Sequence, residues 1–115
     1  MKVEQLAASA ALRSVCIPDP SREITGGFTS DLLSDVMANA EEGSVLITIQ
    51  GHKNSVAVAS LIGLPAIILC SGRKAPEDMI TAAREQQVAL LGTDCNQFET
   101  TCRVADLLGH SHHAG

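Results

Sequence analysis

The chain has 115 residues, of which 45% are hydrophobic and 18% charged, a balance typical of a globular domain rather than a disordered chain. Its net charge is -5, whereas proteins that bind nucleic acids or anionic membranes are typically basic. Only 2% of its residues are aromatic, so few side chains could stack on bases. No apolar run approaches the ~18 residues of a membrane span, so the composition predicts neither a nucleic-acid nor a membrane partner.

The first forty residues predict two helices and two short strands. Residues 2–12 carry apolar side chains at helical spacing. Strands are expected at 14–17 and 23–27, because a proline-rich turn separates two short runs that contain β-branched residues. Residues 31–40 have one clearly apolar face and form an amphipathic helix, which we expect Thr29 or Ser30 to cap.

The central stretch predicts a βαβ unit. Its strands, at 44–50 and 66–70, are almost continuously apolar, which is typical of parallel strands buried on both faces. The helix between them is apolar nearly all round, so it needs cover on more than one side. We expect Asn54 to cap this helix through its side-chain oxygen.

The last third of the chain predicts two more helices around a final strand. Pro76 suits the first turn of a helix, and a strand is expected at 88–91. We expect Asp94 to cap the last helix with Gln97 as its capping-box partner, and Phe98 to face inward.

Together these elements predict a three-layer α/β/α sandwich with a mainly parallel sheet of about five strands. We expect residues 1–109 to form a single domain and the His-containing tail, 110–115, to be disordered. The excess apolar surface of the central and 31–40 helices favours a homodimer. The N-terminus lacks the apolar core of a signal peptide and no apolar run is long enough to span a membrane, so we expect a cytoplasmic location in which the four cysteines are reduced.

Ligands of such sheets bind beyond the carboxyl ends of the strands. Three loops leave those ends, and with two flexible cations, a histidine and helix N-termini they can hold a small anion. The alternative interpretation is that these residues are helix caps and solvated loop charges. The candidate ligand-binding residues are Gln50, His52, Lys53, Asn54, Ser71, Gly72, Arg73, Thr93 and Asp94.

A second candidate phosphate cradle is the glycine-rich segment at Thr25, Gly26 and Gly27, which opens onto a helix. A tight turn or bulge is the preferred interpretation of such a glycine pair, and the phosphate cradle is the alternative. In either case we expect Gly26 or Gly27 to adopt a positive φ or to let backbone pass closely. The segment lacks the lysine and the spacing of a P-loop, and the chain contains no such match.

Nothing in the sequence predicts catalysis, a metal site or a cofactor. Asp31 and Asp35 share a helix face at i, i+4, where a solvated face is the preferred interpretation and an acid pair or metal site the alternative. No Ser-His-Asp or Cys-His set stands out, and the cysteine spacing fits neither zinc nor iron–sulfur ligation.

The chain from Lys2 to Leu108 resembles the DRTGG domain family. The resemblance rests on Ile-Thr-Gly-Gly at 24–27, Asp-Leu-Leu-Ser-Asp-Val-Met-Ala-Asn-Ala at 31–40, Ile-Thr-Ile-Gln at 47–50 and Asn-Ser-Val-Ala-Val-Ala at 54–59. Glu23 and Ile24 stand where the naming motif has Asp and Arg, so no role of that arginine carries over.

The resemblance implies a domain similar to the N-terminal, non-catalytic domain of HPr kinase/phosphorylase. Members of the family occur beside CBS domains in regulated pyrophosphatases, in phosphotransacetylases and as small proteins near hydrogenase genes. We therefore expect a non-catalytic regulatory or assembly module that dimerises and binds a small anionic or nucleotide-like ligand. The alternatives are a small enzyme acting on a phosphorylated or acyl-phosphate metabolite, and an adaptor subunit of a hydrogenase-type redox complex.

Overall fold

The computed structural model describes residues 1–9 and 11–109, so the expected tail at 110–115 lies outside the described residues. The elements follow one another as α1 (Val3–Ala7), β1 (Arg13–Cys16), β2 (Gly26–Thr29), α2 (Leu33–Asn39), β3 (Ser44–Thr48), α3 (Lys53–Ile62), β4 (Ala66–Leu69), α4 (Glu77–Gln86), β5 (Ala89–Gly92) and α5 (Gln97–Leu107). That residues 1–109 form a single domain stays a prediction.

The five strands form one sheet in the order β1-β5-β4-β3-β2. Strands β2 to β5 are parallel to one another, and β1 lies antiparallel to β5. The predicted mainly parallel sheet is therefore confirmed. Because β1 runs the other way, its first residue, Arg13, pairs with the last residue of β5, Gly92. The start of β1 thus lies at the carboxyl edge of the parallel strands.

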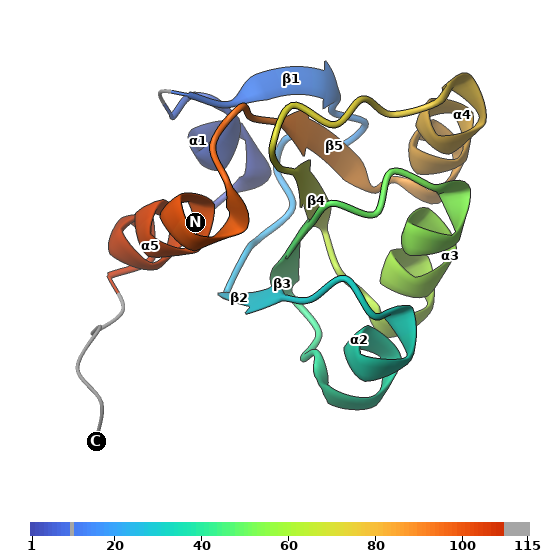
Figure 1. Ribbon diagram of the computed structural model, residues 1–115, viewed down its shortest axis with the longest axis horizontal. Coiled ribbons are helices and arrows are strands. Elements are labelled where there is room, and N and C mark those ends of the chain that lie inside the picture. The colour runs from blue at the N-terminus through green and yellow to red at the C-terminus, as the bar shows by residue number, and fades with distance from the viewer. Residues whose placement is uncertain (10, 110–115) are drawn as a thin grey trace.

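Helices cover both faces of the sheet (Figure 1). One apolar core lies between the sheet and α2, α3 and α4, and includes Val36, Val56 and Met79. A second lies between the sheet and α1 and α5, and includes Leu6 and Val104. Every residue of β3, β4 and β5 is buried, as the continuous apolar runs predicted. The three-layer α/β/α sandwich is confirmed.

Helix α3 is covered on several sides within the one chain. It packs on the sheet between α2 and α4, and Val56 and Ala59 are completely buried (Figure 1). Leu61 is the exception, because 70% of it remains exposed. The nearly uniform apolar character of this helix is therefore explained mostly by its neighbours in the same chain.

Three expected element boundaries were wrong. The helix expected at 2–12 is the shorter α1, and the strand expected at 23–27 is β2, which begins at Gly26. The helix expected at 31–40 begins at Leu33, because Ser30 Oγ accepts the Leu32 amide at 3.2 Å in a turn that precedes the helix. The expected cap therefore lies outside the helix.

The glycine pair lies inside strand β2 and not in a turn. Neither Gly26 nor Gly27 has a positive φ, and a Cβ at either would meet its neighbours at ordinary distances of 3.5 Å or more. The expected turn or close approach was therefore wrong. The left-handed residue nearby is Gly43, with φ of 88°, which lies at the amino edge of the sheet and whose carbonyl accepts the Thr25 amide at 2.9 Å.

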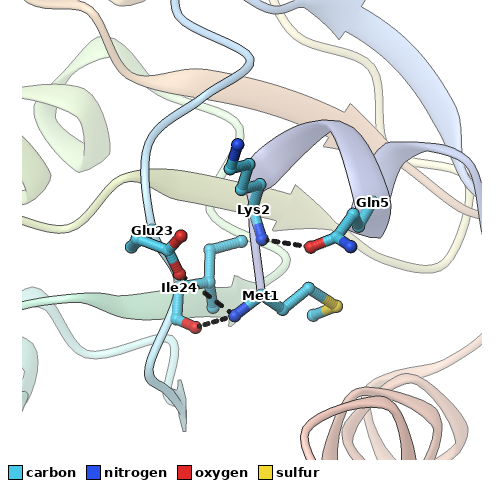
Figure 2. A network of polar contacts seen from close by, with 5 residues as sticks. All are labelled: Met1, Lys2, Gln5, Glu23 and Ile24. Atoms are coloured by element: carbon cyan, nitrogen blue, oxygen red, sulfur yellow. Dashed lines mark hydrogen bonds and ion pairs between the residues drawn. The ribbon is translucent and has the colours of Figure 1, made fainter.

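The first residues are tied to the segment that leads into β2 (Figure 2). The amino group of Met1 donates to Glu23 Oε2 at 3.2 Å and to the Ile24 carbonyl at 3.1 Å. Lys2 donates its amide to Gln5 Oε1 at 2.7 Å, which closes the first turn of α1. Ile24 is buried in the core beneath α1, so the position of the family's arginine is an apolar core position in this chain.

Candidate functional site

A basic pocket of about 370 Å³ lies at the carboxyl edge of the sheet. We call it the edge pocket. Three cationic side chains, Arg13, Arg73 and Lys74, line it together with one carboxylate, Asp94. Its remaining walls are apolar or glycine, from Val15, Leu69, Gly72, Ala75 and Gly92. The arrangement can hold a compact anion that also carries an apolar part.

Arg73 reaches the pocket from a tight turn after β4. Ser71 and Gly72 both adopt left-handed backbone, with φ of 59° and 69°. Their amides donate to the carbonyls of Cys95 and Thr93, at 2.8 and 2.9 Å. These bonds fix the turn against the loop after β5, so the position of Arg73 is set by the sheet edge and not by a free loop.

Arg13 reaches the same pocket from the antiparallel strand. Its guanidinium lies over Gly92, where a Cβ would come within 3.3 Å of it. Arg13 Nη1 donates to Asp94 Oδ1 at 3.0 Å, and the two side chains are 52% and 86% exposed. A Cβ at Gly72 would lie 3.5 Å from the Asp94 carboxylate. The two glycines thus leave room for an ion pair that lies across the pocket.

A second cluster, centred on Asp31, joins three loops at the same edge. Asp31 Oδ1 accepts hydrogen bonds from Thr48 Oγ1, the Ile49 amide and Gln97 Nε2, each at 2.9 Å. Gln50 Nε2 donates to the Asp31 carbonyl at 2.8 Å. The preferred interpretation of Asp31 as part of a solvated helix face was therefore wrong, because it precedes α2 and ties the loops after β2, β3 and β5 together.

His52, and not Asn54, caps α3. The His52 Nδ1 atom accepts the Asn54 amide at 3.1 Å. The expected cap was wrong because the helix begins one residue before Asn54, which puts that side chain in the first turn. Lys53 and Asn54 instead line a groove of about 420 Å³ between α3 and α4, whose other walls include Leu61 and Gln86.

The last helix is also capped by a different residue from the one expected. Asn96 accepts the Glu99 amide at 2.9 Å, whereas Asp94 pairs with Arg13. The expected inward face was wrong for Phe98, which is 77% exposed, because Thr100 and Val104 are the buried residues of α5.

The predicted site residues therefore lie in separate places. Of the candidates near the strand ends, Gly72, Arg73 and Asp94 line the edge pocket, while Ser71 holds the turn beneath Arg73. Thr93 is buried, and its Oγ1 accepts the Cys95 amide at 3.1 Å.

Thr25, Gly26 and Gly27 lie at the opposite edge of the sheet. Gly26 pairs with Ser44, the first residue of β3, so the length of that strand, roughly 15 Å, separates them from the carboxyl edge. They line a hollow of about 310 Å³ that also includes Glu41 and contains no cationic side chain. These three residues are therefore not part of the group of predicted site residues at the carboxyl edge.

Sequence reasoning missed Arg13 and Val15 as pocket residues. An arginine at the start of a strand can lie at either edge of a sheet, depending on whether that strand runs parallel or antiparallel to its neighbours. The sequence signal available was that no helix is expected between the strands at 14–17 and 23–27. A connection without a crossover helix does not favour a parallel pair of strands. Pairing with β5, more than seventy residues later in the chain, decides the matter.

Metal ligation and membrane insertion have no support in the part of the chain that the structure describes. Within residues 1–9 and 11–109, no three side chains of His, Cys, Asp or Glu gather as a metal site would require. None of the helices in these ranges has the length and apolar character needed to span a bilayer.

A similar fold occurs in the CBS and DRTGG domains of the regulatory region of Clostridium perfringens pyrophosphatase, solved with its activator, diadenosine tetraphosphate. The TM-score is 0.66 at 13% sequence identity, over 89% of this chain and 44% of that one. This chain thus spans less than half of that solved region. No protein-family model matches the chain. The curated proteins also contain no match. The likeness is therefore one of architecture, and on that ground the chain has a DRTGG-like α/β fold.

Proposed function

We propose that this protein is a regulatory module that binds a small anionic, nucleotide-like ligand in the edge pocket. The observation that carries the proposal is the gathering of Arg13, Arg73 and Lys74 around one cavity in a chain whose net charge is -5. Cations concentrated in this way against the overall charge favour a specific anion, because arginine matches phosphate oxygens in geometry as well as in charge.

The shape of the pocket supports the same proposal. Its volume of about 370 Å³ falls within the range of small-molecule sites. It lies beyond the carboxyl ends of parallel strands, where α/β sheets commonly bind ligands. The apolar side chains of Val15, Leu69 and Ala75 offer a surface for a base or another apolar group. The nucleotide activator of the similar pyrophosphatase region adds support for this ligand class.

Thermal unfolding with a panel of ligands tests the proposal. We expect at least one of AMP, ADP, ATP, diadenosine tetraphosphate or inorganic pyrophosphate to raise Tm. A ligand at one hundred times its Kd stabilises the folded state by about 2.7 kcal/mol, which is several degrees for a domain of this size. If none of these ligands shifts Tm at millimolar concentration, the proposed function is wrong.

A matched pair of arginine variants locates the site. Arg73→Gln removes a cation from the edge pocket, and we expect it to weaken binding about tenfold or more because a charge-assisted hydrogen bond is lost. Arg84→Gln makes the same charge change on the exposed surface of α4 and should leave affinity within about twofold. Equal loss in both variants would mean that binding follows net charge and not the pocket.

The same preparations separate a binding module from a small enzyme. Turnover of phosphorylated or acyl-phosphate metabolites, lost in His52→Ala or Lys53→Ala, would favour the enzyme. Against that alternative, His52 Nδ1 already accepts the Asn54 amide in capping α3, so this nitrogen is not available as a general base in the observed arrangement.

We also propose that the module is a homodimer that associates through α2 and α3. Large apolar side chains are exposed on these helices, including Leu61 at 70% and Met37 at 50%. Sedimentation at micromolar protein should give a dimer, and Leu61→Glu should give a folded monomer. Leu107→Glu places the same charge on α5 in the other helix layer and should leave the dimer intact. A wild-type monomer would contradict this part of the proposal.

A reducing, cytoplasmic location belongs to the same proposal. All four cysteines, Cys16, Cys70, Cys95 and Cys102, are unpaired. When intact cells are lysed directly into denaturant that contains excess thiol-blocking reagent, all four cysteines, including the buried Cys70, should be labelled. A disulfide in the protein recovered in this way would contradict the location.

A further inference from the structure

The ion pair between Arg13 and Asp94 holds an anion in the edge pocket already, in the form of a carboxylate. Arg13 Nη1 lies 3.0 Å from Asp94 Oδ1, and both residues line the cavity with Arg73 and Lys74. A carboxylate oxygen on a guanidinium occupies the place that a phosphate oxygen takes in an arginine–phosphate pair. Asp94 and an anionic ligand therefore compete for the same guanidinium.

Two glycines in the pocket wall leave space for this ion pair, which remains exposed to solvent. Gly92 lies beneath the guanidinium and Gly72 beneath the carboxylate, at distances where a Cβ would come within 3.3 and 3.5 Å. The side chains are nevertheless 52% and 86% exposed, and such an exposed ion pair contributes little free energy. A doubly charged phosphate, held also by Arg73 and Lys74, can therefore displace the carboxylate.

We infer that Asp94 is a built-in competitor of the ligand, whose carboxylate must leave Arg13 when an anion enters the edge pocket. The inference rests on the proposed function. Asp94 lies two residues before Asn96, the N-cap of α5. Ligand entry thus displaces a carboxylate close to the start of a helix that, together with α1, covers one face of the sheet, and the affinity of the site is set by how readily Asp94 is displaced.

The test is the sign of the change in affinity when the carboxylate is removed. Isothermal titration with ADP and with inorganic pyrophosphate should show tighter binding to Asp94→Asn, by about three- to tenfold. Asp94→Ser should behave in the same way. Glu85→Gln changes the net charge equally on the exposed surface of α4 and should stay within twofold of wild type.

A double variant distinguishes competition for Arg13 from the removal of a nearby negative charge. In an Arg13→Gln background, Asp94→Asn should bring no more than the gain of Glu85→Gln, because no guanidinium remains to be released. If the full gain persists in that background, Asp94 acts through its charge alone and the inference is overturned.

Each remaining outcome is also informative. If wild type binds and Asp94→Asn binds equally or more weakly, Asp94 is a ligand contact or a bystander, so the inference fails while the proposed function stands. If neither wild type nor Asp94→Asn binds either probe, the inference is overturned, and the proposed function is overturned with it when the other ligands of the thermal-unfolding panel also leave Tm unchanged.

Discussion

Gln97 donates its side-chain amide to the Asp31 carboxylate across 2.9 Å, although 66 positions separate the two residues in the sequence. The same carboxylate oxygen accepts the hydroxyl of Thr48, which is completely buried. This one oxygen therefore joins the first residue of α5 to the end of a central strand. The edge of the sheet that carries the edge pocket owes part of its rigidity to this contact.

Replacement of Asp31 by alanine should lower the free energy of unfolding by about 2–3 kcal/mol, because it leaves three partly buried donors without an acceptor. Chemical denaturation measures the effect. Asp35→Ala is the matched control, since Asp35 accepts only the exposed Asn39 side chain at i, i+4 and should cost about 0.5 kcal/mol or less. Similar losses in the two variants would show that the Asp31 contacts contribute little.

The glycines around β2 should differ sharply in their tolerance of alanine. Gly43→Ala places a Cβ 2.5 Å from Thr25 Oγ1 at a φ of 88°, so it should destabilise the protein by more than about 1 kcal/mol. Gly27→Ala meets only ordinary contacts and should be neutral or slightly stabilising. Thermal unfolding of both variants checks the order, and the reverse order would contradict the strand assignment of the glycine pair.

Removal of the His52 side chain should cost more stability than removal of Asn54. His52→Ala leaves an amide at the start of α3 without its acceptor and should cost about 0.5–1 kcal/mol. Asn54→Ala changes an exposed side chain in the first turn and should stay within about 0.5 kcal/mol of wild type. Urea titrations of the two variants decide between them; a larger loss in Asn54→Ala would restore Asn54 as the cap.

Cys70 should resist alkylation in the folded protein, unlike the partly exposed cysteines. Burial raises the pKa of the Cys70 thiol, and the hydrogen bond with Thr100 opposes this shift only in part. Mass spectrometry after brief treatment with iodoacetamide should therefore find Cys16, Cys95 and Cys102 modified before Cys70. Early modification of Cys70 would mean that this end of β4 opens readily.

The raised pKa of Cys70 also predicts a loss of stability at alkaline pH. Above about pH 8.5 the thiol of the unfolded chain loses its proton while the buried thiol keeps it. Deprotonation therefore stabilises the unfolded state relative to the folded state. The free energy of unfolding should fall between pH 8 and 10, and Cys70→Ala should be less stable but show a smaller fall over this interval. An equal fall in both proteins would assign the pH dependence to other groups.

The sequence predicts well those features of this protein that depend on patterns along the chain. The apolar runs that became β3 and β4 identified parallel strands buried on both faces, and the βαβ unit around α3 followed from them. The sandwich architecture follows from the alternation of strands and helices, because each element must bury its apolar face against a neighbour. The sequence also predicted that Arg73 and Asp94 lie at the carboxyl edge, since the loop after a parallel strand can lie nowhere else.

Only the tertiary structure decided which residues meet. Arg13 belongs to the edge pocket because β1 pairs antiparallel with a strand near the other end of the chain, and no local pattern records that direction. The caps moved to His52 and Asn96 because small shifts in where a helix begins are set by contacts across loops. Asp94 does not cap the helix and instead accepts a hydrogen bond from Arg13, because the strand order places the two charged side chains beside each other at the sheet edge.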